Sequence, residues 1–573
     1  ADSFDRMGEI IAIAKGGLIL IEQERESLEG SMIGHHGALT ELESSLGLDS
    51  GAIGIEVQIE DAKGLTYVDA ISAASTRTQA LHFGPGDFQA SMGMPSVALG
   101  QLNPDYPGDV LHHVYGRLLV SARAHDLQVL DGPYLAIKDL AGLSAAAKRV
   151  AAMGFDVLYL PPVHPIGIAH RKGKNNSLDA QPDDCGVPWA IGNSDGGHDA
   201  INPALGTMKD FEDFVKAAGK QGLEIAMDLA LQTSPDHPWV KSNPEWFNKR
   251  ADGTIAYAEN PPKKYQDIYP INFDDDYEGI RNEVLRIIRL WVSKGVKIFR
   301  VDNPHTKPVH FWQDVLAIVH KESPEVVFLA EAFTRPAMMH ALGKAGFHQS
   351  YTYFTWRTSK GELVDYGREV AQGTSAFFRP NFWVNTPDIN PFHLQSGNPA
   401  MFALRAVLAS TLTPSWGMYA GYELYEHRAF KEGGEEYMDS EKYEIKVRDW
   451  EGAGKKGLTL APFITQLNAI RKAHPALQRL RNLTFHDTDS DAIVAYSKRD
   501  GKDLILVVVN LDPSFAQGTT VHWNMEALGF SSNEFEVKDL LDGSAMTWSP
   551  HTYVSLNPTR PVGKVAHIVS VKI

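Results

Sequence analysis

An arginine and an aspartate lie two residues apart at the end of an apolar stretch, VKIFRVDNPHTK (residues 296–307). The stretch begins with strand-forming residues. Side chains two apart on a strand point to the same face, so Arg300 and Asp302 are aimed the same way. A carboxylate that must stay ionised to attack a substrate would gain from such a neighbour, because a cation favours its charged form and fixes its rotamer. A purely structural Arg–Asp pair is the alternative.

Three more acids end or follow apolar stretches: Asp228 in EIAMDLAL, Glu331 after VVFLA and Asp388 in NFWVNTPDIN. Any one of them could simply cap a helix. Several acids on one rim are harder to explain structurally, because crowded carboxylates repel one another. A pair of carboxylates can cleave a glycosidic bond: one attacks the sugar carbon, and the other protonates the leaving oxygen and then activates the acceptor.

The elements that must position these acids follow a regular order. Four consecutive helix–strand alternations, with near-continuous apolar strands, indicate a parallel sheet covered on both faces. One predicted helix, TMKDFEDFVKAAGKQGL, begins with a capping-box pattern at Thr207 and Asp210. The pattern predicts an α/β fold, a (β/α)8 barrel in which function collects at the C-terminal ends of the strands. A doubly wound open sheet is the alternative, but no glycine-rich nucleotide loop opens a helix, and we expect no cofactor and no metal.

The sequence predicts three regions. Residues 1–130 form an N-terminal region with a helical start and mixed structure after it, which we assign to no module. Residues 131–477 form the barrel, and LQVLDGPYLAIKD (127–139) could supply its first strand in altered form. Residues 478–573 alternate between strands with few helices, which is typical of an all-β, sandwich-like domain.

Composition excludes some functions. The formal net charge of −17 argues against general binding to nucleic acid or to an anionic membrane. Cys185 is the only cysteine, so no internal disulfide can form. The apolar stretch IIAIAKGGLILIE is too short and too interrupted to span a bilayer and lacks the flanks of a signal peptide. We therefore expect a cytoplasmic protein.

Several motifs resemble those of a known family. GGHDA (196–200) with NPALGT (202–207) resembles the opening signature of α-amylase-type barrels, the glycoside hydrolase family 13 enzymes. DLALQ, FRVDN, FLAEA and NTPDIN then follow in the order of the later motifs of that family. From about 145 to about 500, stretches such as AYAENPPKKYQDIYP and SEKYEIKVRDW are similar, almost word for word, to the α-1,4-glucan:maltose-1-phosphate maltosyltransferases.

The resemblance implies a retaining glycosyltransferase. It would move maltosyl units from α-maltose 1-phosphate to the non-reducing end of an α-1,4-glucan through a covalent intermediate, with release of phosphate. Asp302 would be the nucleophile, Glu331 the general acid/base with a raised pKa, and Asp388 a stabiliser of the transition state. Gln232-Thr233 and Pro387-Asp388 replace the Asn-His and His-Asp of ordinary amylases, which argues against a plain hydrolase.

The same resemblance assigns binding residues. Asn260, Lys263 and Tyr265 would hold the donor phosphate, and Arg300 would support the nucleophile. The residues expected to contact the maltosyl unit are Lys172, Gln232, Asp267, Asn303, Lys442 and Tyr443.

Two other functions stay open: a related retaining enzyme of the trehalose synthase or amylase type, and an inactive barrel that only binds glycan. Release of phosphate from maltose 1-phosphate in the presence of glucan would separate them from the first. Family members usually begin with a β-sandwich domain that helps to form a homodimer, and residues 1–130 do not match that domain.

Overall fold

The computed structural model describes most of residues 147–572, with gaps at 182–183, 261–262, 530 and 560–561. Before residue 147 it describes separate segments only. These are 10–12, 18–21, 39–40, 43–44, 54–59, 61–83, 88, 91–92, 112–125 and 128–130. The chain divides into two compact units, Ala1–Asp139 and Leu140–Ile573. None of the described helices is long and apolar enough to cross a membrane.

The N-terminal unit contains a five-stranded sheet in the order β1-β2-β3-β4-β5. Strands β2 to β5 run parallel and β1 is antiparallel to β2. Apolar residues of β3, β4 and α5 form its core. The described elements are β1 (Ile10–Ala12), β2 (Leu18–Ile21), β3 (Gly54–Ile59), α2 (Ala62–Thr66), α3 (Val68–Ala73), β4 (Thr78–Phe83), α5 (His112–Ala124) and β5 (Gln128–Leu130).

One prediction for this region is wrong at the described residues 10–12 and 18–21. The helical start is replaced by β1 and β2, because two short runs rich in Ile and Leu, separated by Gly16 and Gly17, pair with each other instead of continuing as one helix. The suggested first barrel strand at 127–139 is tested only at residues 128–130, which form β5 and pair with β4 in the N-terminal sheet. The other residues of that stretch, apart from these three, lie outside the described residues.

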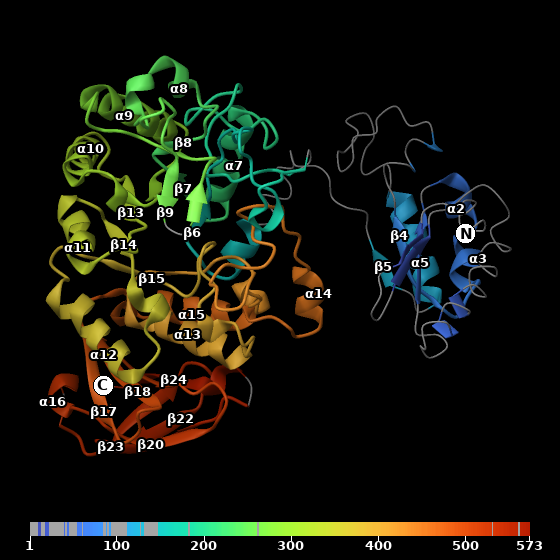
Figure 1. Ribbon diagram of the computed structural model, residues 1–573. Coiled ribbons are helices and arrows are strands. Elements are labelled where there is room, and N and C mark those ends of the chain that lie inside the picture. The colour runs from blue at the N-terminus through green and yellow to red at the C-terminus, as the bar shows by residue number, and fades with distance from the viewer. Residues whose placement is uncertain are drawn as a thin grey trace. The chain divides into compact units, whose positions relative to one another are not determined.

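The barrel sheet of the second unit has the order β16-β15-β14-β13-β12-β7-β6, with every neighbouring pair parallel. This order follows the chain without a reversal, which excludes the doubly wound alternative. Helices cover the outside of the sheet (Figure 1). The strands are β6 (Val157–Leu160), β7 (Glu224–Leu229), β12 (Ile298–Val301), β13 (Val327–Ala330), β14 (Gln349–Tyr351), β15 (Pro380–Trp383) and β16 (Trp416–Gly417).

The two edges of this sheet curl towards each other. The ring of Phe155, just before β6, lies 5.1 Å from that of Trp416 in β16. Asn468 bridges the same edges, because its side chain accepts from the Trp416 indole and donates to the Met153 carbonyl. The described residues contribute seven strands to the barrel.

The covering helices begin at residues suited to do so. Thr207 and Asp210 form the predicted capping box at the start of α7. Asp276 caps α9, whose buried face includes Ile280, Ile288 and Trp291. The helices of this unit are α7 (Met208–Lys220), α8 (Pro238–Ser242), α9 (Tyr277–Ser293), α10 (Val309–Glu322), α11 (Pro336–Ala345), α12 (Lys360–Arg368), α13 (Pro399–Leu412), α14 (Trp450–Lys455), α15 (Ala461–Ala473) and α16 (Met525–Leu528).

The predicted all-β C-terminal domain is confirmed. Its antiparallel sheet has the order β22-β21-β24-β19-β18-β17-β20-β23. One face of β18 and β19 packs with α13 and α15, and the other face builds a core with Trp523 and Trp548. The strands are β17 (Leu483–Thr488), β18 (Ile493–Asp500), β19 (Asp503–Asn510), β20 (Gln517–His522), β21 (Phe535–Asp539), β22 (Ala545–Trp548), β23 (His551–Leu556) and β24 (Ala566–Val571).

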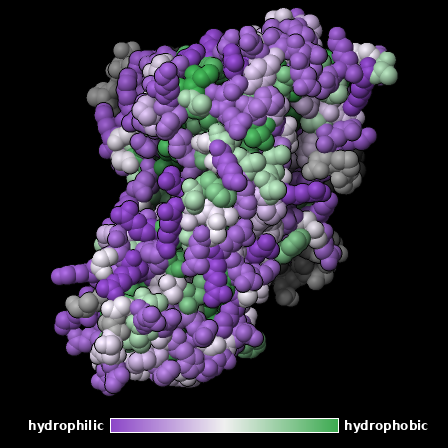
Figure 2. Space-filling model, turned by 90° about the vertical axis from the view of Figure 1, so that its left-hand side faces the viewer, coloured by the Kyte–Doolittle hydropathy of each residue, from purple (hydrophilic) through white to green (hydrophobic). Residues whose placement is uncertain are grey.

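Hydrophilic residues cover most of the face shown in Figure 2, and hydrophobic ones gather there only in small separate areas. This agrees with the acidic composition.

Candidate active site

The acids at the strand ends belong to three neighbouring barrel strands. Asp228 is in β7, and Asp302 and Glu331 directly follow β12 and β13. In the sheet Arg300 is in register with Asp228 on one side and with Leu329 on the other. Because the strands are parallel, their C-terminal ends bring these side chains to the same rim.

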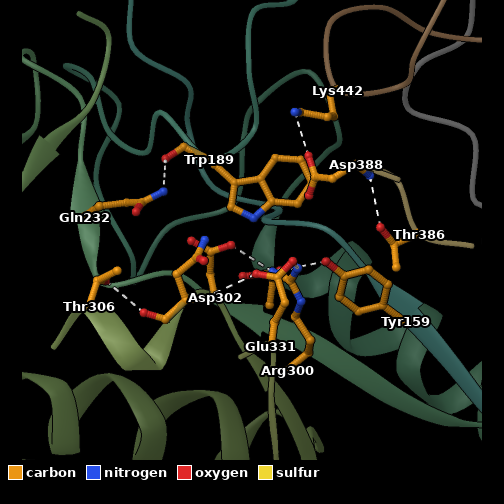
Figure 3. Close-up of polar contacts among 12 residues, drawn as sticks. Tyr159, Trp189, Gln232, Arg300, Asp302, Thr306, Glu331, Thr386, Asp388 and Lys442 are labelled. Carbon is orange, nitrogen blue, oxygen red and sulfur yellow. Dashed lines mark hydrogen bonds and ion pairs between the residues drawn. The ribbon is translucent and has the colours of Figure 1, made fainter. Parts of the chain in front are cut away.

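Arg300 contacts all three acids (Figure 3). Its Nη1 donates to Asp228 Oδ2 at 2.7 Å and to Asp302 Oδ1 at 3.0 Å. Its Nη2 lies 2.6 Å from Glu331 Oε1. The arginine side chain is 2% exposed, and those of Asp302 and Glu331 are 8% and 5% exposed. The sequence predicted the Arg300–Asp302 pair; the structure adds two further carboxylates to it.

Burial changes the protonation of this cluster. It raises the pKa of Asp228 to about 7, although Arg300 acts in the opposite direction. It also raises the pKa of Glu331 well above its ordinary value, again against the effect of Arg300. This direction agrees with the one expected for Glu331 from the sequence. A buried carboxyl with a raised pKa can hold a proton near neutral pH and donate it.

Two tyrosines complete the cluster. Tyr159 in β6 donates its hydroxyl hydrogen to Asp228 Oδ2 at 2.6 Å. The rings of Tyr159 and Tyr351 each lie 5.7 Å from the Arg300 guanidinium carbon. The sequence analysis selected neither of them for the site. The tyrosine in the strand DVLYLPP was the available signal, but an aromatic residue in a barrel strand is more often part of the core.

Asp388 lies on another part of the rim, among loops. Its Oδ1 is 2.5 Å from Lys442 Nζ, and its side chain is 36% exposed. Its backbone N–H donates to the Thr386 hydroxyl. Burial acts to raise the pKa of Asp388, but Lys442, Arg300 and Lys263 together lower it. The carboxylate is therefore ionised beside a cation.

Two of the residues expected to contact the sugar, Lys172 and Asp267, are buried. Lys172 is buried and donates to Gln266 Oε1 at 3.0 Å. Asp267 is buried, and burial raises its pKa; its Oδ1 has no hydrogen-bond partner among the described residues. A buried acceptor of this kind suits a ligand hydroxyl.

An indole lies in the middle of the site. The Trp189 carbonyl accepts from Gln232 Nε2 at 3.5 Å. Figure 3 shows the Trp189 ring between Gln232 and the Asp388–Lys442 pair. Trp189 and Tyr443 belong to one small apolar cluster. The sequence analysis did not select Trp189.

The three residues expected to bind phosphate lie in a small hairpin. Asn260 in β9 (Ala258–Asn260) is in register with Lys263 in β10 (Lys263–Tyr265). Lys263 is half exposed, and its Nζ lies 2.6 Å from Glu436 Oε1. The sequence analysis did not predict this partner. The described residues contain no group of three His, Cys, Asp or Glu side chains that could hold a metal ion.

Fold and site together define a parallel α/β barrel with a carboxylate cluster at the C-terminal ends of its strands. The structure resembles the solved maltogenic α-amylase AmyB from Thermotoga neapolitana, with a TM-score of 0.59 and 19% identity over 77% of this chain and 96% of that one. It also resembles the acarbose complex of the α-amylase from Geobacillus thermoleovorans, with a TM-score of 0.57 and 16% identity over 76% of this chain and 92% of that one. The predicted fold class is confirmed.

Within that class, the maltosyltransferase resemblance is confirmed. The chain is 58% identical over 427 residues to α-1,4-glucan:maltose-1-phosphate maltosyltransferase 2 of Streptomyces coelicolor, covering 74% of this chain and 64% of that protein. It is 56% identical over 428 residues to the Mycolicibacterium smegmatis protein of that name, covering 74% of this chain and 61% of the relative. The chain thus spans less than two thirds of these relatives. Residues 485–571 match the family described as GLGE, C-terminal.

The N-terminal part matches something else. Residues 30–161 match the family described as HpcH/HpaI aldolase/citrate lyase. The sequence analysis assigned no module there. The described parallel strands β3, β4 and β5, with α2, α3 and α5 between them, lie within that match.

Proposed function

We propose that this chain transfers maltosyl units from α-maltose 1-phosphate to the non-reducing end of α-1,4-glucans with retention of configuration. The observation that carries this function is the Arg300 side chain, which joins Asp302 to Glu331, a buried carboxyl with a raised pKa, at adjacent strand ends. The identity to maltosyltransferases selects the donor and the acceptor.

Two displacements account for retention. Arg300 engages Asp302 Oδ1, so Oδ2 is the oxygen that attacks the anomeric carbon. The bond from that carbon to the phosphate oxygen breaks, and the phosphate leaves with the electron pair and the Glu331 proton. The glucan 4-hydroxyl then attacks the same carbon, its proton passes to Glu331, and the bond to Asp302 breaks.

The donor phosphate would meet the hairpin that carries Asn260, Lys263 and Tyr265. In this proposal the phosphate takes the place of Glu436 at the Lys263 ammonium. An exposed ion pair has a small net stability, so a dianion can replace one partner at little cost. Lys442 would keep Asp388 ionised to stabilise the positive charge that develops on the sugar.

The test is incubation of the full chain with maltose 1-phosphate and maltohexaose, followed by measurement of free phosphate and of chain length. Phosphate release with glucans longer by two glucose units is expected. In a parallel incubation with maltose, formation of trehalose would indicate a trehalose synthase. Shortened glucan without phosphate release would indicate an amylase. Glucan binding without turnover would indicate an inactive barrel.

A cytoplasmic location and a homodimer are part of this proposal, the first from the acidic composition and single cysteine and the second from the family. Light scattering of the full chain tests the dimer: a mass near twice 63.1 kDa is expected.

A further inference from the structure

We propose that Lys307 is a positioning residue of this site: its buried ammonium holds the turn that carries the nucleophile and gives the carboxylate cluster its second positive charge. This inference rests on the proposed function and concerns a residue to which the sequence analysis assigned no role.

The turn after β12 folds back on Lys307. The short 3₁₀ helix η3 (Pro304–Thr306) directly precedes this lysine. Lys307 Nζ donates to the carbonyl oxygen of Asp302 at 3.2 Å and to that of Asn303 at 3.3 Å. The residue is 8% exposed. Among the described residues no carboxylate lies within ion-pair distance of it, so backbone carbonyls are its contacts.

The turn that Lys307 contacts also links the two reacting carboxylates, Asp302 and Glu331. Asn303 adopts a left-handed conformation, with φ of 41°, which a residue with a side chain rarely adopts without support. Its backbone N–H donates to Glu331 Oε2 at 3.3 Å. Lys307 therefore holds the carbonyl of the residue whose amide contacts the acid/base, and also the carbonyl of the nucleophile itself.

A neutral residue could make similar contacts, and one already does. The Thr306 hydroxyl donates to the same Asn303 carbonyl at 2.8 Å, and the Trp312 indole donates to the Pro304 carbonyl at 3.0 Å. Since these two bonds also support the turn, the distinctive contribution of Lys307 is its charge.

The positive charge of Lys307 favours the ionised forms of the nearby carboxyls. Burial lowers the pKa of Lys307, and the nearby carboxylates Asp302, Glu331 and Asp228 oppose that effect. Burial and then Lys307 lower the pKa of His305, so this histidine is neutral at pH 7. The charged or titratable groups that face Lys307 are Asp228, Arg300, Asp302, His305 and Glu331. Without Lys307, Arg300 would be the only cation among these groups that favours the ionised forms of the three carboxyls.

The experiment compares Lys307→Met, Lys307→Gln and Lys307→Arg with Thr306→Val, which removes a neutral hydrogen bond to the same carbonyl. The full chain is assayed with α-maltosyl fluoride and a glucan acceptor, because this donor has no phosphate group that titrates. The acid limb of kcat/KM against pH reports the carboxylate that must be ionised. Removing a cation favours the protonated form, so the limb moves to higher pH.

We expect Lys307→Met to lower kcat about ten- to a hundredfold and to move the acid limb up by about one pH unit. Lys307→Gln should recover part of kcat through its amide hydrogens while the limb stays displaced. Lys307→Arg should return the limb to its wild-type position, and Thr306→Val should not move it.

An unmoved limb in folded Lys307→Met or Lys307→Gln would overturn the proposal, as would an equal displacement in Thr306→Val. If neither neutral variant folds, the test rests on Lys307→Arg. A displaced acid limb of its kcat/KM profile overturns the proposal, and an unmoved acid limb supports it. Wild-type turnover of the fluoride without turnover of maltose 1-phosphate would refute the proposed donor and leave this test intact.

Discussion

The two sides of the candidate site hold their charges in different ways. On the strand side, Arg300 is 2% exposed and joins Asp302 and Glu331, which are almost as well buried. On the loop side, Asp388 is 36% exposed beside Lys442, and Lys263 is 50% exposed beside Glu436. The strand side is a fixed network in which each charge depends on the others. The loop side consists of two ion pairs that each have a more exposed member, although Arg300 and Lys263 also act on the Asp388 carboxylate.

The difference shows which groups can change partners. Removing one member of a buried network leaves an uncompensated charge, at a cost of about 3–5 kcal/mol. An exposed pair contributes about 0–1 kcal/mol, so a ligand can take the place of one member. The strand side is therefore suited to chemistry at a fixed position, and the loop side to binding and releasing a charged leaving group.

The largest effect is expected on the strand side, at the nucleophile. Asp302→Ala should lower kcat by about three orders of magnitude or more, because no other carboxylate can take its position. Steady-state kinetics with maltose 1-phosphate measures the effect, and circular dichroism checks the fold. If the variant retains more than about a tenth of the wild-type kcat, a barrier change of about 1.4 kcal/mol, Asp302 is not the nucleophile.

The next effect separates the two strand-side carboxylates. Glu331→Ala should still react with α-maltosyl fluoride, since fluoride leaves without a proton, but the covalent adduct should persist because nothing activates the acceptor. Mass spectrometry of peptic peptides should find one maltosyl group on Asp302. An adduct on another residue, or none at all, would contradict the assignment.

The sequence predicted the strand side better than the loop side, and the reason is physical. Asp228, Arg300, Asp302 and Glu331 stand at the ends of apolar strands, and parallel strands must bring their ends together. Glu436, the partner of Lys263, is 173 residues away in the sequence. It lies on a loop, and the position of a loop cannot be predicted from a periodic pattern of hydrophobic residues. Loop contacts depend on tertiary packing, so local patterns cannot predict them.

The N-terminal unit shows a second limit. Short apolar runs near residues 10–21 fit a helix or a strand equally well by composition, and pairing with a neighbouring strand decides between them. The same competition explains β5, which pairs with β4 and therefore does not begin the barrel.

On the loop side, Lys263→Ala should lower kcat/KM for maltose 1-phosphate by roughly 1.5–3 kcal/mol, about ten- to a hundred-and-fifty-fold, if the lysine holds the phosphate. The variant should use α-maltosyl fluoride almost as well as the wild type, because fluoride offers no dianion to the ammonium. Lys264→Ala is the matched control: this neighbouring lysine is also exposed, and it is in register with Glu259, not Asn260. An equal loss with both donors would assign Lys263 a general structural role.

The smallest effect is expected at Glu436, which forms an ion pair with Lys263 in this structure. The backbone around Glu436 is well held, because its carbonyl accepts from Phe430 N–H and the neighbouring Glu435 carboxylate accepts from the Trp356 indole. The Glu436 carboxylate therefore competes with phosphate for the ammonium at 2.6 Å.

Glu436→Gln should remove this competition and tighten inhibition by inorganic phosphate about two- to fivefold, the range of an exposed ion pair. The KM for maltose 1-phosphate should fall by a similar factor, and turnover of α-maltosyl fluoride should stay the same. Glu432→Gln makes the same change in charge at an exposed position of the same loop. It controls for the general electrostatic effect of removing one negative charge. Weaker phosphate inhibition in Glu436→Gln would mean that Glu436 orients Lys263 towards the phosphate. The loop-side pair would then belong, like the Arg300 cluster, to a fixed network, and the contrast between the two sides would fail at this point.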